Sequence, residues 1–171
     1  DSSGGNRDAT QSTAANQPTY YAGGLNGKPT VHFDGSNHQL TFTSFSSINH
    51  TVFWVARYNR RSDNVILGHA TDANQGVLSI PGDANSGGYN AGAGNSATFS
   101  EIKDGYNLSY SIWMVNRSNL TVSLFRNGTQ LSTTQSLSSN TALTIGAIGI
   151  DGGREFGGNV SEIIIYTRDL S

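Results

Sequence analysis

The sequence predicts an all-β fold, a two-sheet antiparallel sandwich or jelly roll, on three observations. Short segments rich in Val, Ile, Thr, Phe and Tyr alternate with clusters of Gly, Asn, Asp and Ser, which is the pattern of strands between turns. The pairs Asn26-Gly27, Asp34-Gly35 and Asn127-Gly128 tolerate the positive φ of tight turns and indicate hairpins. No segment keeps the i, i+3, i+4, i+7 apolar spacing of a helix, so we expect less than ~10% helix.

Composition narrows the class of protein. The 171 residues fit one domain, 1–171. Hydrophobic residues make up only 35%, but the deficit is filled by Gly, Ser, Thr and Asn rather than by charge, which favours many turns over disorder. A net charge of −2 does not suggest nucleic acid or an anionic membrane as a partner, so we expect neither. No apolar run approaches the ~18 residues of a membrane span, so we expect no membrane insertion.

The predicted strands follow the apolar segments. They cover residues 30–33, 38–42, 50–58, 65–68, 76–80, 109–117, 120–127, 143–148 and 159–166. Residues 1–29 are predicted to be loop, and residues 81–107 contain too much Gly for a strand. Segments 51–56 and 162–166 are apolar on both faces, as in central strands of a covered sheet. From their alternation we expect a core of Phe33, Phe53, Val55, Ile163 and Ile165.

Several motifs in fixed order carry a family resemblance. They are Gln17-Pro-Thr-Tyr20, the strand Asn26-Gly-Lys-Pro-Thr-Val-His-Phe-Asp-Gly35, the central Thr51-Val-Phe-Trp-Val55 and the final Gly158-Asn-Val-Ser-Glu-Ile-Ile-Ile-Tyr166. In this order the chain resembles the laminin-G-like jelly rolls of the concanavalin A-like lectin/glucanase superfamily. The resemblance also implies a strand before Asp1 and a helix opened by Arg168-Asp-Leu-Ser171. We therefore expect a module of a larger multidomain chain.

Catalytic residues are not expected. Hydrolases of the family that the chain resembles use a Glu-x-Asp-x-x-Glu strand, whose carboxylates lie ~5 Å apart. The resemblance therefore implies catalysis only if this motif is present. Glu101, Glu155 and Glu162 belong to no such motif. The histidines have no zinc-ligand spacing; His32 and His38 flank Asp34-Gly35 and are expected to face solvent or to satisfy that turn.

Calcium is the one metal that the sequence leaves open. Asp72-x-Asn74 and Asp83-x-Asn85 present oxygen ligands at alternate positions before a Gly, as calcium loops do. Two further candidate ligands are Asp34 and Asp151. Neither loop ends in a bidentate Glu, and Asp and Asn are also good turn residues. The alternative is that these residues only form turns.

Sugar contacts are sought among aromatic residues near uncharged polar groups. Tyr89 lies in the Gly-rich stretch with Asn90 and Asn95, and we expect it to be exposed, because Gly lets a ligand approach and a tyrosine can stack on a sugar. Tyr58 and Trp113 are a second candidate face. Trp54 and Trp113 lie in central strands, however, where packing in the core is the alternative.

The function that follows is mostly an implication of the resemblance. It implies a non-catalytic binding module of an extracellular or surface-exposed protein, with glycan binding or adhesion as its role. A structural spacer in an adhesin, filament or virion fits the low charge equally well. A polysaccharide hydrolase or lyase is the third reading, and the missing carboxylate pair argues against it.

Overall fold

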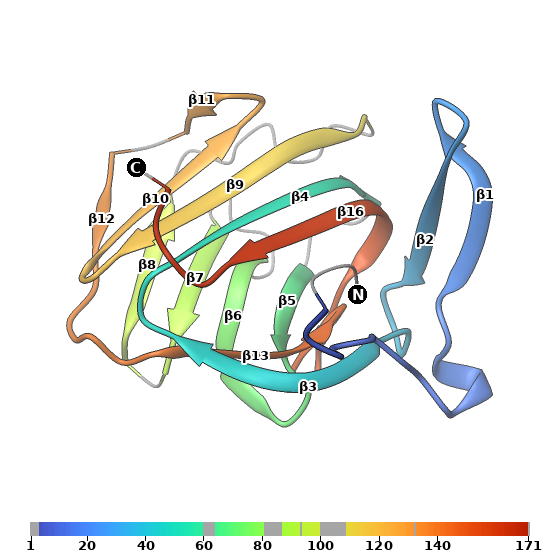
Figure 1. The fold of residues 1–171 in the computed structure, drawn as a ribbon, viewed down its shortest axis with the longest axis horizontal. Coiled ribbons are helices and arrows are strands. Elements are labelled where there is room, and N and C mark those ends of the chain that lie inside the picture. The colour runs from blue at the N-terminus through green and yellow to red at the C-terminus, as the bar shows by residue number, and fades with distance from the viewer. Residues whose placement is uncertain are drawn as a thin grey trace.

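The computed structural model describes residues 4–59, 64–80, 87–92, 94–99, 109–131 and 133–170. Within these residues two antiparallel sheets pack into a sandwich (Figure 1), and the helical content is one 3-10 turn, η1 (Ala14–Asn16). The predicted all-β jelly-roll class with little helix is confirmed. No helix in these segments has the length and apolar character that a membrane span needs.

The larger sheet has the strand order β1-β2-β16-β4-β9-β10-β11, with β12 beside β10. Its strands are β1 (Thr19–Leu25), β2 (Lys28–Asp34), β4 (His50–Tyr58), β9 (Ser111–Ser118), β10 (Thr121–Arg126), β11 (Thr129–Gln130), β12 (Gln135–Ser136) and β16 (Gly157–Tyr166). This sheet therefore joins the two ends of the chain, because β16 lies between β2 and β4.

The smaller sheet has the order β3-β13-β5-β6-β7-β8. Its strands are β3 (Leu40–Ser47), β5 (Asn64–His69), β6 (Asp72–Ile80), β7 (Gly87–Ala91), β8 (Ser96–Phe99) and β13 (Leu143–Ile148). A separate short hairpin is formed by β14 (Ile150–Asp151) and β15 (Arg154–Glu155).

Two of the three predicted turns are hairpins. Asn26 and Gly27, with φ of 48° and 75°, join β1 to β2, and Asn127 and Gly128, with φ of 50° and 80°, join β10 to β11. These are the conformations that Asn-Gly favours. The prediction that residues 1–29 are loop is wrong at β1. That strand is exposed along almost its whole length, so its sequence carries no apolar alternation.

Asp34-Gly35 is a corner between the sheets rather than a hairpin. Strand β2 pairs with β1 and β16, whereas β3 belongs to the smaller sheet. Asp34 Oδ1 accepts hydrogen bonds from the backbone N–H groups of Ser36, Asn37 and His38 at 2.9, 3.2 and 3.1 Å. Burial raises the pKa of Asp34, but these bonds outweigh it and the pKa is lowered.

The core lies between the two sheets. On β4, the set of alternate side chains that points into the core is the one that was not predicted to do so. Val52, Trp54 and Ala56 are buried, whereas Phe53 and Val55 lie on the outer face and are half-buried. The predicted burial of Phe53 and Val55 between the sheets is therefore wrong. Residues 52, 54, 56 and 58 form the more apolar set, because the other set continues to an arginine at 57.

The rest of the predicted core is confirmed with one refinement. Phe33 is fully buried, and Ile163 and Ile165 pack against the core while remaining half-buried. Trp54 and Trp113 stack in the core with ring centroids 6.0 Å apart, which confirms their core-packing alternative.

Candidate functional site

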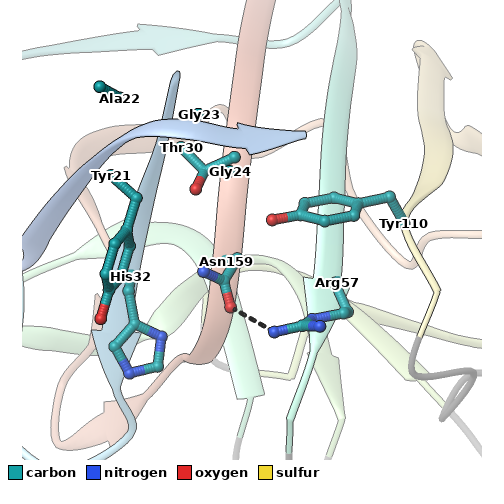
Figure 2. Close-up of a pocket in the computed structure, with 9 residues that line it drawn as sticks. All are labelled: Tyr21, Ala22, Gly23, Gly24, Thr30, His32, Arg57, Tyr110 and Asn159. Atoms are coloured by element: carbon teal, nitrogen blue, oxygen red, sulfur yellow. Dashed lines mark hydrogen bonds between the residues drawn. The ribbon is translucent and has the colours of Figure 1, made fainter. Parts of the chain in front are cut away.

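An open pocket of about 520 Å³ lies beside the β1–β2 hairpin (Figure 2). Its floor is a row of three side chains, because Asn159 of β16 is directly opposite His32 of β2 on one side and Arg57 of β4 on the other. Directly opposite residues share a sheet face. Since Ala56 points into the core, this row lies on the outer face. The volume falls within the usual range for small-molecule sites.

A bulge in β16 sets the phase of this row. Val160 pairs with Ala56 and Glu162 pairs with Val55, so Ser161 is the extra residue. A bulge reverses the alternation of side chains along a strand. Asn159 therefore points outward to the pocket, while Ile163 further along the same strand packs against the core.

Strand β1 forms one wall of the pocket. Its register shifts between Tyr21 and Leu25, and its backbone there passes so close to β2 that a Cβ on Gly24 would lie 2.0 Å from Thr30 Oγ1. Only glycine allows this approach. Thr30 is buried, lines the pocket, and its Oγ1 has no hydrogen-bond partner in the described part of the chain.

Two tyrosine rings border the polar floor. Tyr21 is 48% exposed, and its ring centroid lies 6.2 Å from that of His32 in an edge-on arrangement. Tyr110, just before β9, lies by the guanidinium of Arg57, whose Cζ is 5.7 Å from the ring centroid. Figure 2 shows Tyr21 and His32 on one side of Asn159, and Arg57 with Tyr110 on the other.

The Arg57 guanidinium is held in place but is not fully satisfied. Its Nη2 donates a hydrogen bond to Asn159 Oδ1 at 3.1 Å. Its Nε is buried and has no partner among the described residues, and no ion pair with a carboxylate is found for it there. The pocket therefore offers a cation that is held in position by Asn159.

The lining defines what the pocket can do. Aromatic faces beside hydrogen-bonding groups can hold a polar ligand that has a flat apolar side. None of the nine described lining residues is Asp or Glu, so the described part of the lining contains no carboxylate pair for glycoside hydrolysis.

The residues predicted to contact a sugar lie elsewhere and form no accessible cluster. Tyr89 has no exposed surface, so the expectation that it is exposed is wrong. Residues 87–91 of the Gly-rich stretch form β7, which turns Tyr89 into the core, and Tyr58 and Trp113 are buried as well. Asn95 is buried and donates hydrogen bonds from Nδ2 to the carbonyls of Ala91 and Ser139. Asn90 is half-buried in β7.

Tyr89 instead belongs to a closed polar cluster. The Arg117 side chain is fully buried, donates from Nη1 to Tyr89 Oη at 3.1 Å, and donates from Nε to the Asn119 carbonyl at 2.9 Å. His50 stacks on Tyr89 with centroids 5.7 Å apart. Burial, and then the charge of Arg117, lowers the pKa of His50 to about 4. The imidazole is therefore neutral at pH 7.

The calcium candidates that the structure describes act as turn or pairing groups. Asp72 Oδ1 accepts hydrogen bonds from the backbone N–H and the Nδ2 of Asn74 at 3.0 and 3.3 Å. Asp83 and Asn85 lie outside the described residues. Across the described ranges no group of three or more His, Asp or Glu could hold a metal ion. Calcium binding stays a prediction.

The other acidic candidates that the structure describes are also apart from the pocket. Asp151 is buried and forms an ion pair with Arg154; burial raises its pKa, while the Arg154 charge opposes this. Glu155 lies in β15 and Glu162 is exposed on β16. Glu101 lies outside the described residues.

A second cavity, of about 670 Å³, differs in character from the pocket. It lies next to the N-terminal segment at Gly4 and Gly5 and is lined mainly by apolar side chains, including Phe42, Phe45 and Ile163. Such a lining offers few hydrogen bonds, so this cavity is the weaker candidate for a polar ligand.

Sequence reasoning missed the pocket because its members look ordinary along the chain. His32 was expected to face solvent, Tyr21 lay in a predicted loop, and Arg57 and Asn159 carried no prediction as site residues. One signal was present. With Trp54 and Tyr58 assigned to the core, Arg57 necessarily falls on the outer face of β4.

Comparison with solved structures identifies the fold. Domain 4 of the extracellular arabinanase AbnA of Geobacillus stearothermophilus, solved with arabinotriose, is similar with a TM-score of 0.71 and 16% identity, over 91% of this chain and 77% of that one. Domains LG4-5 of the mouse laminin α1 chain give a TM-score of 0.53 and 15% identity, over 83% of this chain and 43% of that one. The chain has the laminin-G-like jelly-roll fold.

A carbohydrate-binding module shares this laminin-G-like jelly roll. The CBM40 of the Ruminococcus gnavus IT-sialidase, solved with α2,3-sialyllactose, gives a TM-score of 0.54 and 14% identity, over 83% of this chain and 91% of that one. No family model and no curated protein sequence matches the chain. At these identities the similarity concerns the fold.

Proposed function

We propose that this domain is a non-catalytic carbohydrate-binding module and that its site is the pocket beside the β1–β2 hairpin. The observation that carries the proposal is the exposed Tyr21 ring beside the polar row of His32, Asn159 and Arg57. A tyrosine ring stacks on the apolar face of a sugar while neighbouring polar groups bind its hydroxyls. The pocket size fits a small ligand.

The fold supports the proposal without deciding it. The same jelly roll occurs in proteins solved with arabinotriose and with sialyllactose, although fold alone does not determine function. The nine described lining residues include no Asp or Glu, which supports a non-catalytic role. We also propose, as for most such modules, an extracellular or surface location within a larger protein.

A glycan array followed by calorimetry tests the proposal. We expect binding by the unmodified domain, and a loss of about five- to tenfold in affinity for Tyr21→Ala, since loss of one stacking contact costs about 1–1.5 kcal/mol. The matched control is Tyr20→Ala. Tyr20 is the adjacent residue on β1, 66% exposed, and does not line the pocket, so this variant should bind normally. Full binding by Tyr21→Ala would refute the assignment of the site.

A structural spacer is the second candidate, and one observation favours it. The outer face of the larger sheet exposes Ile112, Ile164 and Tyr166 at 56%, 40% and 40%, and contiguous apolar surface often marks a contact with another protein. This role would be favoured if the domain bound no glycan on the array and released no product from any oligosaccharide incubated with it.

A further inference from the structure

The pocket has more hydrogen-bond donors than acceptors. Arg57 offers only donors, and its buried Nε has no partner in the part of the chain that the structure describes. The Oδ1 of Asn159 already accepts a bond from Arg57 at 3.1 Å, so part of its acceptor capacity is used. Thr30 Oγ1 is a second buried polar atom that has no partner among the described residues.

Side-chain acceptors are scarce in comparison. Asp and Glu are absent from the nine described lining residues. The His32 imidazole carries at most one acceptor nitrogen, and the tyrosine and threonine hydroxyls donate as readily as they accept. A neutral sugar presents hydroxyls, each of which carries a proton that needs an acceptor. A carboxylate or sulfate group presents only acceptors, so it matches this lining better.

The position of Arg57 strengthens the match. Its guanidinium is held between Asn159 and the ring of Tyr110, so little freedom is lost when a ligand binds. A half-buried guanidinium with no counter-ion among the described residues gains most from an anionic partner, since it can donate two parallel hydrogen bonds to a carboxylate or sulfate.

We infer that this pocket selects acidic sugars, in which a carboxylate or sulfate group pairs with Arg57 while the ring stacks on Tyr21. This inference rests on the proposed carbohydrate-binding function and names its ligand class. The anion can belong to a uronic acid or to a sulfated sugar, and the chemistry at Arg57 is shared by the two.

Isothermal titration with matched probe pairs tests the inference. Trigalacturonate, triguluronate and a hyaluronan tetrasaccharide are each compared with their methyl esters, and lactose 3′-sulfate is compared with lactose; inorganic sulfate is titrated alone. We expect the acidic member of at least one pair to bind about tenfold or more tightly than its neutral partner. Which pair responds distinguishes a carboxylate from a sulfate ligand. The preference should weaken with added NaCl.

Two variants locate the charge. Arg57→Gln should abolish the difference within the pair, whereas Lys28→Gln, an exposed cation at the start of β2 outside the pocket, should preserve it. Equal or tighter binding of the neutral members would overturn the acidic preference and leave the proposed function standing. Sulfate binding as tight as the acidic sugar would overturn it in favour of a simple anion site. No binding to any sugar here or on the array would overturn both.

Discussion

Two clusters in this molecule are built from the same residue types and differ in almost everything else. In each, an arginine lies over a tyrosine ring, with Cζ 5.8 Å from the Tyr89 centroid for Arg117 and 5.7 Å from the Tyr110 centroid for Arg57. Each also contains a histidine beside a tyrosine. The Arg117 cluster is closed within the core, whereas the Arg57 cluster lines an open pocket.

The difference comes from the face on which each arginine lies. Arg117 is on the inward phase of β9 with Trp113 and Val115, and Arg57 is on the outward phase of β4 with Phe53 and Val55. The closed cluster therefore serves stability, and the open one is available to a ligand. Residue type alone does not separate these roles, but strand phase does.

The largest expected effect is the loss of Tyr89. Tyr89→Ala should lower the free energy of unfolding by about 3–5 kcal/mol, because it leaves a cavity in the core and removes the hydroxyl that partners Arg117 and His50. Urea denaturation measures this. If the loss were below 1 kcal/mol, the cluster would not be the structural one. Sugar binding at permissive temperature should be retained.

The pH dependence of stability is the next effect. The pKa of His50 is about 4 in the folded protein and 6.5 when unfolded, so the unfolded chain binds more protons between these values. Stability should fall as the pH decreases from 6.5 to 4, by about 3 kcal/mol from this residue. His50→Gln should remove that part of the slope in denaturation curves at several pH values. An unchanged slope in His50→Gln would show that His50 titrates normally.

A smaller effect is expected where β1 passes over β2. Gly24→Ala would place a Cβ 2.0 Å from Thr30 Oγ1 and should cost about 1–3 kcal/mol, as overpacking does, while weakening sugar binding as the wall of the pocket moves. Gly23→Ala is the control, since its Cβ would meet nothing within 4 Å. Equal melting temperatures for the two variants would contradict this account of the wall.

The smallest effect on stability is expected in the open cluster. Tyr21→Ala should change the free energy of unfolding by less than about 0.5 kcal/mol, since the ring is 48% exposed. Tyr21→Ala should lose binding and keep stability, whereas Tyr89→Ala should lose stability and keep binding, so the two variants together separate the two roles. A loss of more than 2 kcal/mol in Tyr21→Ala would show that the open cluster is structural as well.

The features of the fold that the sequence predicted correctly are those that depend on local contacts. Asn26-Gly27 and Asn127-Gly128 form hairpins because their preferred φ values decide the turn without help from distant strands. Asp34-Gly35 has the same local signal but forms a corner, because β2 finds its partners in β1 and β16. Such pairing depends on strands that are distant in the sequence, so the residues of the turn do not predict it.

The candidate site could not be predicted from the sequence for the same reason. Its row joins residues 32, 159 and 57, and no local pattern connects them. The bulge at Ser161 also reverses the phase of β16 midway, so alternation counted from Ile163 puts Asn159 on the wrong face. The burial of Tyr89 was missed because a Gly-rich segment gave no strand signal.

The stacked tryptophans have an optical consequence. The chain contains two tryptophans, and they stack on each other in the core with an interplanar angle of 4°, away from the residues that line the pocket. Their emission should shift to longer wavelength when the core opens to water, and it should stay constant when a ligand occupies the outer face. Intrinsic fluorescence should therefore report unfolding of this domain but not ligand binding. A titration that shows no change in emission is no evidence against binding.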